Sequence, residues 1–366
     1  MKTKFTKEQL SIISSPKSKK LISASAGTGK THTLVGAAEK VIKEKGNKTA
    51  IFTFTNAAAD ELKERMEVLP TYIGTIHSFA LREIERMDKE GVIASELMST
   101  DQVRRLLLNS YSHLYPIRRD YKRELSDIMR YMLNKDYMPD ISVIRRYDAV
   151  INLYNKRKRE LNLYDNADAP EYLVKKMAEV NWKLDYTHLF VDEVQDIDTA
   201  EFTLISSFEG DVFAIGDPRQ NIYQFRNSID RIFEKLEKMG YNLYILTESF
   251  RSYQEILDFA DARLKARRGT GGVIMGVEIL DVNPDTVILC RYNHYVRRLE
   301  PYFNNVYTVH AYKGKESDDV LIVDFIPSTE EEENIMFVAK TRARNRLGIA
   351  KLEDIVQKGR KIKYGL

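Results

Sequence analysis

The sequence predicts an α/β protein with two parallel β-sheets. The evidence is a set of seven short apolar runs, rich in β-branched and aromatic residues, each followed by a polar turn and a helical pattern. Such runs are typical of buried parallel strands that alternate with helices, and seven of them are too many for one small sheet. The runs are KKLISAS (19–25), TAIFTFT (49–55), HLFVDE (188–193), VFAIGD (212–217), LYILTE (243–248), TVILCR (286–291) and DVLIVDF (319–325).

Composition is typical of an intracellular globular protein. The 366 residues are 43% hydrophobic and 30% charged, which suits two or three domains with buried cores. A net charge of +3 is too small to indicate a polyanionic partner by itself. The single cysteine, Cys290, ends an apolar run, so we expect a buried thiol in a reducing compartment. Because we find neither a membrane span of roughly 18 apolar residues nor a signal-peptide core, we expect a cytoplasmic protein without a membrane partner.

Residues 81–184 differ in composition from the rest of the chain. The stretch is rich in Leu, Tyr, Arg and Lys, and its apolar residues recur at helical spacing, as in Val103, Leu106 and Leu107. We interpret it as a helical subdomain inserted into the first α/β domain. It contains a basic cluster, NKRKRE (155–160), which is either a solvated helix face or a surface for nucleic acid; composition alone favours the solvated face.

The stretch LISASAGTGKTHTL (21–34) combines a strand, a glycine-rich turn and the start of a helix. Glycines let the turn direct N–H groups at phosphate oxygens, while Lys30 brings a positive charge to the β- and γ-phosphates and the Thr31 hydroxyl would hold Mg²⁺. The usual P-loop pattern begins with glycine where this chain has Ala24, but the remaining pattern is intact. The residues expected to contact the nucleotide phosphates are Ala26, Gly27, Thr28, Gly29, Lys30 and Thr31.

The run LFVDEVQD (189–196) places two acidic residues at the end of another predicted strand. Asp192 suits a Mg²⁺ ligand, and Glu193 is the candidate base that orients and deprotonates the attacking water. Asp-Glu pairs at strand ends are common without catalysis, but the P-loop upstream favours the catalytic interpretation. A glutamate beside a metal-bound aspartate indicates hydrolysis rather than transfer to a substrate hydroxyl.

Three arginines are candidates to stabilise the γ-phosphate charge during hydrolysis. They are Arg226, Arg251 in TESFRS and Arg342 in AKTRAR. Each one, taken alone, is more often a surface residue. Their role requires that a second α/β domain faces the first across the nucleotide.

Taken together, these residues resemble the motor core of superfamily 1 helicases of the UvrD/Rep/PcrA type. Besides the P-loop, eight segments follow one another in the family's order. They are FTKEQLSII near the N-terminus, FTFTNAAADELKERM (52–66), GTIHSFA (74–80), DEVQD, AIGDPRQNIYQFRNS, LTESFRS, TVHAYKGKESDDVLIVDF (308–325) and EEENIMFVAKTRARNRL (331–347).

The resemblance implies two RecA-like P-loop motor domains with a helical insertion subdomain in the first. The boundaries that we expect are 1–80 with 185–245 for the first motor domain, 81–184 for the insertion, and 246–366 for the second motor domain with the arginine fingers. Larger relatives carry a second helical insertion within the region that matches residues 286–314. Only PYFNN lies at that place here, so we expect the second insertion to be absent.

On the nucleotide side, the resemblance implies roles for residues in several segments. Gln9 would read the purine edge, Gln195 would couple the sites, and Gln220 would sense the γ-phosphate. Phe250 replaces the family's tyrosine that stacks on adenine, and His32 stands where close relatives have an arginine against the base. The residues implied in nucleotide binding or hydrolysis are Gln9, His32, Gln220, Arg226, Phe250, Arg251, Glu316 and Arg342.

On the strand side, the resemblance implies that Tyr223 and Phe225 stack on bases of a single strand. Base–aromatic stacking contributes about 1–3 kcal/mol per base and tolerates any sequence. The family usually has tryptophan where Phe225 stands, and the alternative is that both rings pack in the core. The other residues implied in DNA binding are Phe54, Asn56, Thr75, His77, Thr308 and His310.

Three functions are compatible with these residues. The first is an ATP- and Mg²⁺-dependent DNA helicase that moves 3′→5′, a polarity that rests on the resemblance alone. The second is a translocase that removes proteins from single strands or needs a partner to unwind, and the third is a P-loop switch without directional motion. The implied partners are single-stranded DNA, tailed duplex DNA and proteins of replication or repair; RNA is an alternative track. The sequence indicates no oligomeric state.

Overall fold

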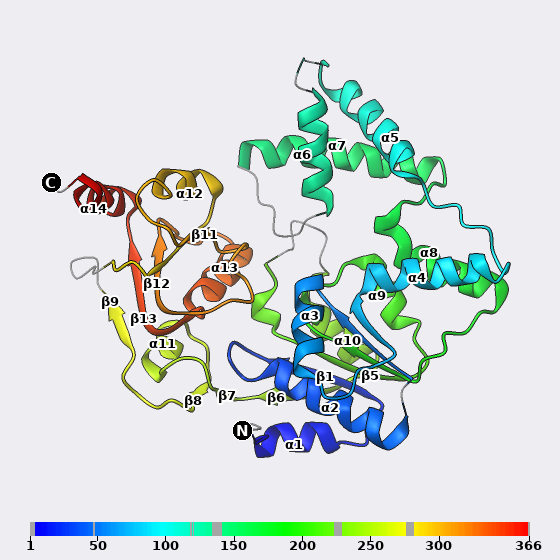
Figure 1. Cartoon of the computed structure of the whole chain (residues 1–366), viewed down its shortest axis with the longest axis horizontal. Coiled ribbons are helices and arrows are strands. Elements are labelled where there is room, and N and C mark those ends of the chain that lie inside the picture. The colour runs from blue at the N-terminus through cyan, green and yellow to red at the C-terminus, as the bar shows by residue number, and fades with distance from the viewer. Residues whose placement is uncertain are drawn as a thin grey trace.

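The chain folds around two parallel β-sheets, as the sequence predicts (Figure 1). One sheet has six strands and the other five, and every pairing within them is parallel. A short parallel pair, β7 (Glu248–Ser249) and β8 (Lys265–Ala266), follows the first sheet along the chain. The structure, a computed structural model, describes residues 4–46, 48–117, 119, 121–133, 141–222, 229–275 and 282–364.

The first sheet has the order β3-β2-β4-β5-β1-β6. Its strands are β1 (Lys19–Ala24), β2 (Thr49–Thr53), β3 (Tyr72–Thr75), β4 (His188–Val191), β5 (Asp211–Gly216) and β6 (Asn242–Leu246). All residues of β2 and β4 are buried, which explains their uninterrupted apolar character. Because parallel strands end at a common edge, the loops after β1, β4 and β5 meet there.

Helices cover both faces of the first sheet and complete what we call the first lobe. On one face α1, α2 and α3 bury an apolar cluster against Ile22, Ile51 and Phe213. On the other face α4, α8, α9 and α10 pack against Leu21 and Phe52. The helices are α1 (Lys7–Ser14), α2 (Lys30–Lys45), α3 (Asn56–Arg65), α4 (Ile76–Lys89), α8 (Ala169–Val180), α9 (Thr199–Ser206) and α10 (Ile232–Lys238), with 3₁₀ turns η1 (Asn166–Asp168), η2 (Val194–Asp196) and η3 (Pro218–Gln220).

Three helices share an apolar cluster of their own and project from the first lobe (Figure 1). They are α5 (Thr100–Leu114), α6 (Tyr121–Leu133) and α7 (Ile141–Glu160). The basic cluster at the end of α7 is not a uniformly solvated face, because Lys158 is only 6% exposed and its ammonium binds Asp165 and Asp168. Burial alone would raise the pKa of Asp165, but the charge of Lys158 outweighs it and lowers that pKa. This network fastens α7 to the turn that leads into α8.

The second sheet has the order β11-β10-β12-β13-β9 and forms the second lobe with its helices. Apolar clusters lie on both of its faces, one with α11 and α13 and one with α12 and α14. Its strands are β9 (Val273–Met275), β10 (Val287–Cys290), β11 (Val306–Thr308), β12 (Ser317–Val323) and β13 (Ala343–Ala350). Its helices are α11 (Gln254–Phe259), α12 (Asn293–Leu299), α13 (Glu330–Lys340) and α14 (Leu352–Tyr364). Between β10 and β11, α12 is the one helix in the described chain.

All seven apolar runs of the sequence are strands in the structure, but β3, β9, β11 and β13 were not predicted. The first three have at most four residues, and β13 contains Arg344 and Arg346 among its apolar residues, which conceals a strand pattern. Cys290 is fully buried as predicted, and burial raises the pKa of its thiol to about 12. It is therefore a core residue rather than a nucleophile.

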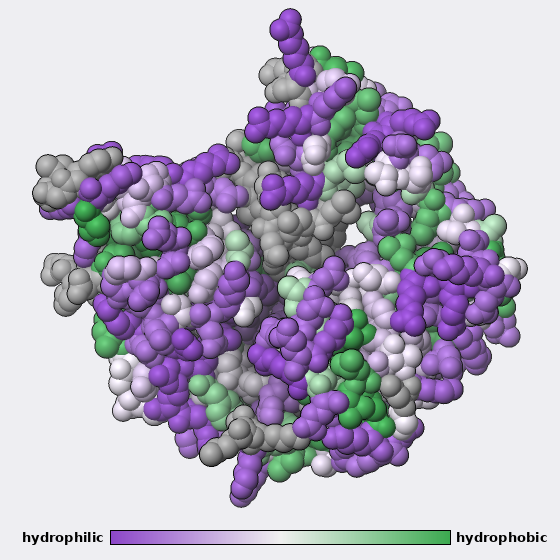
Figure 2. Space-filling view, in the orientation of Figure 1, coloured by the Kyte–Doolittle hydropathy of each residue, from purple (hydrophilic) through white to green (hydrophobic). Residues whose placement is uncertain are grey.

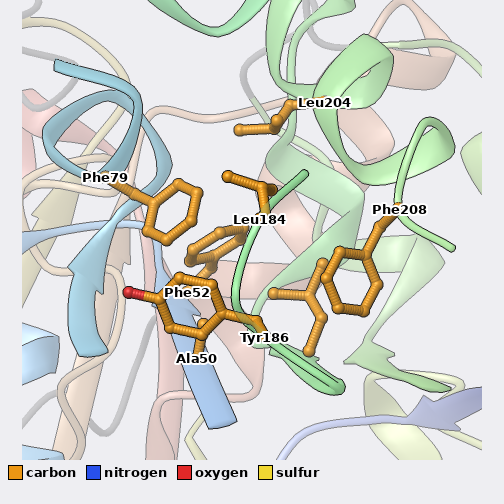
Figure 3. A pocket seen from close by; sticks show the side chains of 8 residues that line it. Ala50, Phe52, Phe79, Leu184, Tyr186, Leu204 and Phe208 are labelled. Carbon is orange, nitrogen blue, oxygen red and sulfur yellow. The ribbon is translucent and has the colours of Figure 1, made fainter. Parts of the chain in front are cut away.

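A small apolar cavity of about 10 Å³ lies within the first lobe (Figure 3). Phe79 of α4, Leu204 of α9 and Phe52 of β2 point toward one another around it. The volume allows one water at most, and the apolar lining offers such a water too few partners. The cavity therefore marks a place where packing is already incomplete.

Leu204→Ala is expected to lower the free energy of unfolding by about 3–5 kcal/mol, because the new void joins the existing one and neighbouring rings cannot collapse into it. Urea titration followed by circular dichroism measures this loss. Leu161, which is 60% exposed, provides the control: Leu161→Ala should change stability by less than about 0.5 kcal/mol. Equal losses in both variants would contradict the packing argument.

The visible face of the molecule is mostly hydrophilic, with scattered apolar side chains (Figure 2). Within the described residues, no helix combines the length and apolar character that a membrane span requires.

Candidate nucleotide site and interlobe contact

The glycine-rich turn after β1 has the backbone that a phosphate loop needs. Gly27 and Gly29 have φ angles of 74° and 82°, a region that glycine adopts without strain. Gly29 is the N-cap of α2, so Lys30 and Thr31 are the first residues of that helix. Free N–H groups and the helix dipole favour an anion at this position. The predicted phosphate residues therefore form one continuous turn at the edge of the sheet.

The acidic pair after β4 lies against this turn. The Asp192 N–H donates to the Phe52 carbonyl at 2.8 Å, which continues the strand pairing, and Glu193 then takes a left-handed conformation with φ of 49°. That turn brings the Glu193 carboxylate to 3.6 Å from the Lys30 ammonium. The Glu193 N–H donates to Asp192 Oδ1 at 3.0 Å. Two carboxylates and a lysine from separate segments thus occupy one place.

Opposite electrostatic surroundings distinguish the two carboxylates. Burial, followed by the charge of Glu193, raises the pKa of Asp192. Burial alone would also raise the pKa of Glu193, but Lys30, Lys313, the Gln195 amide and Arg342 together lower it to about 2. Glu193 is therefore ionised at neutral pH, whereas Asp192 lacks a compensating cation.

A chain of hydrogen bonds leads from Glu193 to the second lobe. Gln195 Nε2 donates to Glu193 Oε2 at 2.7 Å, while Gln195 Oε1 accepts the Asp217 N–H at 3.0 Å. Asp217 Oδ2 accepts Gln220 Nε2 at 2.7 Å, and Gln220 Oε1 accepts Arg342 Nη2 at 3.1 Å. Both glutamines use the two ends of their amides, so the chain has one donor and one acceptor at each step.

Arg251 and Arg342 lie close enough for their charges to interact. Arg342 is only 2% exposed; burial and then the charge of Arg251 lower its pKa to about 9, so it remains protonated at neutral pH. Arg251 binds the Glu316 carboxylate, and its Nη1 donates to the Thr341 carbonyl at 3.2 Å. Glu316 also pairs with Arg344. Both predicted arginines thus face the Glu193 side of the lobe boundary.

Gly216→Ala tests the position of Gln195. A Cβ at Gly216 would overlap Gln195 Oε1 and would lie 3.1 Å from the Val194 nitrogen, so the turn after β4 must move. We expect ATP hydrolysis to fall about tenfold or more and stability to fall by about 1–3 kcal/mol. Gly348→Ala is the control, since its new methyl would meet only movable side chains at 3.1 Å or more. Steady-state ATPase rates would contradict the assignment if Gly216→Ala matched the unmodified chain.

The described residues fit magnesium and a nucleoside triphosphate. Asp192 has a raised pKa that a divalent cation beside it would lower, and the Thr31 hydroxyl is the nearest side-chain oxygen of the helix start. Hard oxygen ligands of this kind suit Mg²⁺. The turn from Gly27 to Lys30 supplies N–H donors and an ammonium, which suit phosphate.

The predicted adenine-side residues are engaged within the protein. Gln9 donates through Nε2 to the Thr28 carbonyl at 3.3 Å and accepts the Thr6 N–H at 3.0 Å, so its amide holds the phosphate loop to α1. His32 stacks on Phe5, with the ring centres 4.3 Å apart. Phe250 is 40% exposed and therefore remains accessible to a ring. Reading of a purine edge by Gln9 stays a prediction.

Comparison with known families agrees with this geometry. The model of the UvrD/REP helicase N-terminal domain matches residues 5–239, which is more than half of the chain. The chain belongs to the UvrD/Rep helicase family. The model of the viral superfamily 1 RNA helicase core domain also matches residues 129–351. The superfamily 1 resemblance inferred from the sequence is therefore confirmed.

Curated relatives of this UvrD/Rep family protein are helicases at low identity. A probable DNA helicase II homolog of Mycoplasma capricolum is 26% identical over 284 residues, covering 67% of this chain and 38% of the relative. The ATP-dependent DNA helicase UvrD1 of Mycobacterium tuberculosis is 26% identical over 307 residues, covering 70% and 40%. The Gabija protein GajB of Bacillus cereus is 26% identical over 260 residues, covering 66% and 45%. The chain thus spans about half the length of these relatives or less.

Within this UvrD/Rep fold, several predicted strand contacts lie at the lobe boundary. Phe54 packs against the core of the second lobe, with the Lys313 ammonium 5.8 Å from its ring centre. His310 is buried, and its Nε2 lies 3.1 Å from the Ile222 carbonyl of the first lobe. Thr308 is also buried, and its hydroxyl accepts the Ala311 N–H. DNA contact by these residues would require the boundary to open.

The remaining predicted strand contacts surround the start of α3 and α4. Asn56 is exposed at the first position of α3. The Thr75 hydroxyl caps α4 by accepting the Ser78 N–H at 3.2 Å. His77 has both ring nitrogens engaged, Nε2 with the Ala167 carbonyl and Nδ1 with Glu201 Oε1, each at 3.1 Å. Of the three, Asn56 is the most accessible to a polynucleotide.

Three predicted residues, Tyr223, Phe225 and Arg226, lie outside the described residues. Their roles in base stacking and nucleotide contact remain predictions from the resemblance.

The sequence analysis missed Lys313 and Asp217. Lys313 forms a buried ion pair with Asp196 across the lobe boundary and donates to the Gln220 carbonyl at 3.0 Å. Asp217 joins the Ser25 hydroxyl to Gln220. Lys313 stands in a polar turn, where a lysine is usually solvated, so no local signal indicated its burial. Asp217 follows a strand, which was a usable signal for a ligand-side residue.

Proposed function

We propose that the chain is an ATP- and Mg²⁺-dependent DNA motor that moves 3′→5′ along single-stranded DNA and unwinds duplex. The observation that carries the proposal is the hydrogen bond from Arg342 of the second lobe to Gln220, the last link of the chain that begins at Glu193. A change at the nucleotide can thereby alter how the lobes contact each other. The names of the relatives, which include ATP-dependent DNA helicases, support the same function.

The residues of the site have separable tasks in this proposal. Lys30 and the N–H groups of the loop hold the phosphates, and Thr31 with Asp192 would hold Mg²⁺, which neutralises phosphate charge when bound. Glu193 orients a water and accepts its proton. Arg251 and Arg342 stabilise the charge that develops on the γ-phosphate. Loss of that charge weakens the hold of Arg342, so the lobes separate.

The lobe boundary links this cycle to a polynucleotide. Phe54, His310 and Lys313 meet there, and they combine ring faces with a positive charge, which suits a single strand. We propose that opening of the boundary changes the grip of these residues on DNA. We also propose that α5, α6 and α7 form an inserted helical subdomain, since they share one apolar cluster.

One observation favours a second candidate, a translocase that does not unwind duplex by itself. Between β10 and β11 the described chain has the single helix α12, where the resemblance leads us to expect a larger insertion in relatives that open duplex. Such a motor would strip proteins from single strands or depend on a partner for unwinding.

ATPase assays with and without single-stranded DNA test the motor, and tailed duplexes test its output. We expect Mg²⁺-dependent hydrolysis that DNA stimulates, and displacement of duplexes with a 3′ tail but not a 5′ tail. Single-stranded RNA is the comparison for the track. Translocation without displacement, measured by removal of streptavidin from a biotinylated strand, would favour the second candidate. Hydrolysis indifferent to any polynucleotide would refute both and favour a switch.

A further inference from the structure

The segment that follows β6 crosses from the first lobe to the second and is bound to both. Upstream, the Thr247 N–H donates to the Glu8 carboxylate of α1 at 3.0 Å. Downstream, the Ser252 hydroxyl donates to the Ala343 carbonyl, and the Tyr253 N–H to the Arg344 carbonyl at 3.4 Å, both at the start of β13. Between these attachments lies Arg251.

Residues 249 and 250 bind the phosphate loop itself. The Ser249 hydroxyl donates to the Ala26 carbonyl at 3.0 Å, and the Phe250 N–H donates to the Gly27 carbonyl at 2.8 Å. Ser249 is fully buried, so water does not compete for its hydroxyl. These bonds engage loop carbonyls, which as acceptors cannot bind phosphate, and they leave loop N–H groups for the anion.

The Ser249 hydroxyl also reaches Arg251. As an acceptor it lies 3.4 Å from the Arg251 N–H, so one oxygen joins the loop backbone to the arginine backbone. Gly27 permits this proximity because it has no side chain: a Cβ there would overlap Arg251 Cβ and lie 2.7 Å from Ser249 Oγ. The loop and Arg251 are therefore in direct contact without passing through Gln220.

We propose that Ser249 is a positioning residue that ties the phosphate loop to Arg251, so that the two lobes pivot about this arginine. The residues before Arg251 move with the loop, and the residues after it move with β13. The Gln220–Arg342 contact is then the separable connection between the lobes, and Ser249 maintains the permanent one. This inference rests on the proposed function, because the task of Arg251 is assigned there.

A double-mutant cycle in ATP hydrolysis separates positioning from mere stability. Because Ser249 acts through Arg251, Ser249→Ala should lower kcat by about three- to tenfold in the unmodified background, with KM for ATP within about twofold. In the Arg251→Ala background it should cause almost no further loss. Effects that multiply in full would overturn the proposal.

Ser110 provides the matched control. It is also fully buried, and its hydroxyl donates to a backbone carbonyl, that of Leu106 in α5, at 2.9 Å. Ser110→Ala should leave kcat within about twofold, and any change should multiply with that of Arg251→Ala. If Ser249→Ala does not fold, Ser249→Cys, which keeps similar volume and a weaker donor, takes its place in the cycle.

Hydrogen exchange of the nucleotide-free chain gives an independent readout. Peptides that cover 24–31 and 247–253 should lose protection together in Ser249→Ala and in neither region in Ser110→Ala. Faster exchange confined to 247–253 would contradict the tie to the loop. An unmodified chain without DNA-stimulated hydrolysis would refute the proposed function, whereas multiplicative kinetics in an active enzyme would refute this inference alone.

Discussion

Glu193→Gln is expected to reduce ATP hydrolysis by about a thousandfold while nucleotide binding persists. The pKa of Glu193 is held at about 2 because Lys30, Lys313, the Gln195 amide and Arg342 outweigh its burial. The amide has no negative charge with which to accept a proton from water, and a positioned base of this kind contributes about 10²–10⁴ in rate. Glutamine still presents an oxygen to Gln195, so the local structure should survive.

Single-turnover hydrolysis and equilibrium binding of a fluorescent ATP analogue measure the two parts of this expectation. The control is Glu85→Gln, which removes a carboxylate on the exposed face of α4, where Glu85 pairs with Lys89. That variant should hydrolyse ATP at the rate of the unmodified chain. If Glu193→Gln retained a tenth of the normal rate or more, the base would have to be sought elsewhere.

Arg342→Ala should have the second largest effect, a loss of about 10³-fold in kcat in the presence of single-stranded DNA. An arginine supplied to the γ-phosphate across a boundary contributes about 10³–10⁵ in related chemistry. Here its removal also breaks the contact with Gln220 and frees the carbonyls of Val338 and Lys315. The lobes should therefore contact each other less firmly, which small-angle scattering would detect as a larger radius of gyration.

Two further variants make the Arg342 result interpretable. Arg342→Lys keeps a positive charge but not the forked donor geometry, so it should restore lobe contact more than hydrolysis. Arg298→Ala removes an exposed arginine of α12 that pairs with Glu353 and should leave the rate unchanged. Normal hydrolysis by a folded Arg342→Ala protein would exclude a direct role at the phosphate.

Local patterns allowed much of this site to be predicted. A glycine-rich turn followed by Lys30 and Thr31, and Asp192 with Glu193 at a strand end, are contiguous in sequence, so each motif reports its own backbone geometry. The structure places both motifs at one sheet edge, with Lys30 and Glu193 3.6 Å apart. Long apolar runs identified the buried strands for the same reason, whereas β13 has a mixed pattern and was missed.

Roles that depend on polar partners could not be predicted in this way. Gln9 was assigned to a purine edge, yet its amide binds Thr6 and Thr28. His77 was assigned to DNA, yet its ring lies between Ala167 and Glu201. Lys158 belongs to a basic run but is buried against two aspartates. A residue type states which bonds a side chain can make, and its neighbours decide which it does make.

The sequence by itself determined the fold class, the family and the chemistry of the phosphate and acidic motifs, because those properties depend on residues that are neighbours along the chain. Only the tertiary structure decided which distant residues act together. Ser249 and Ala26 are 223 positions apart, Arg342 and Gln220 are 122 apart, and Lys313 and Asp196 are 117 apart. Such pairs form because packing of the two sheets excludes water and leaves each buried polar group one available partner.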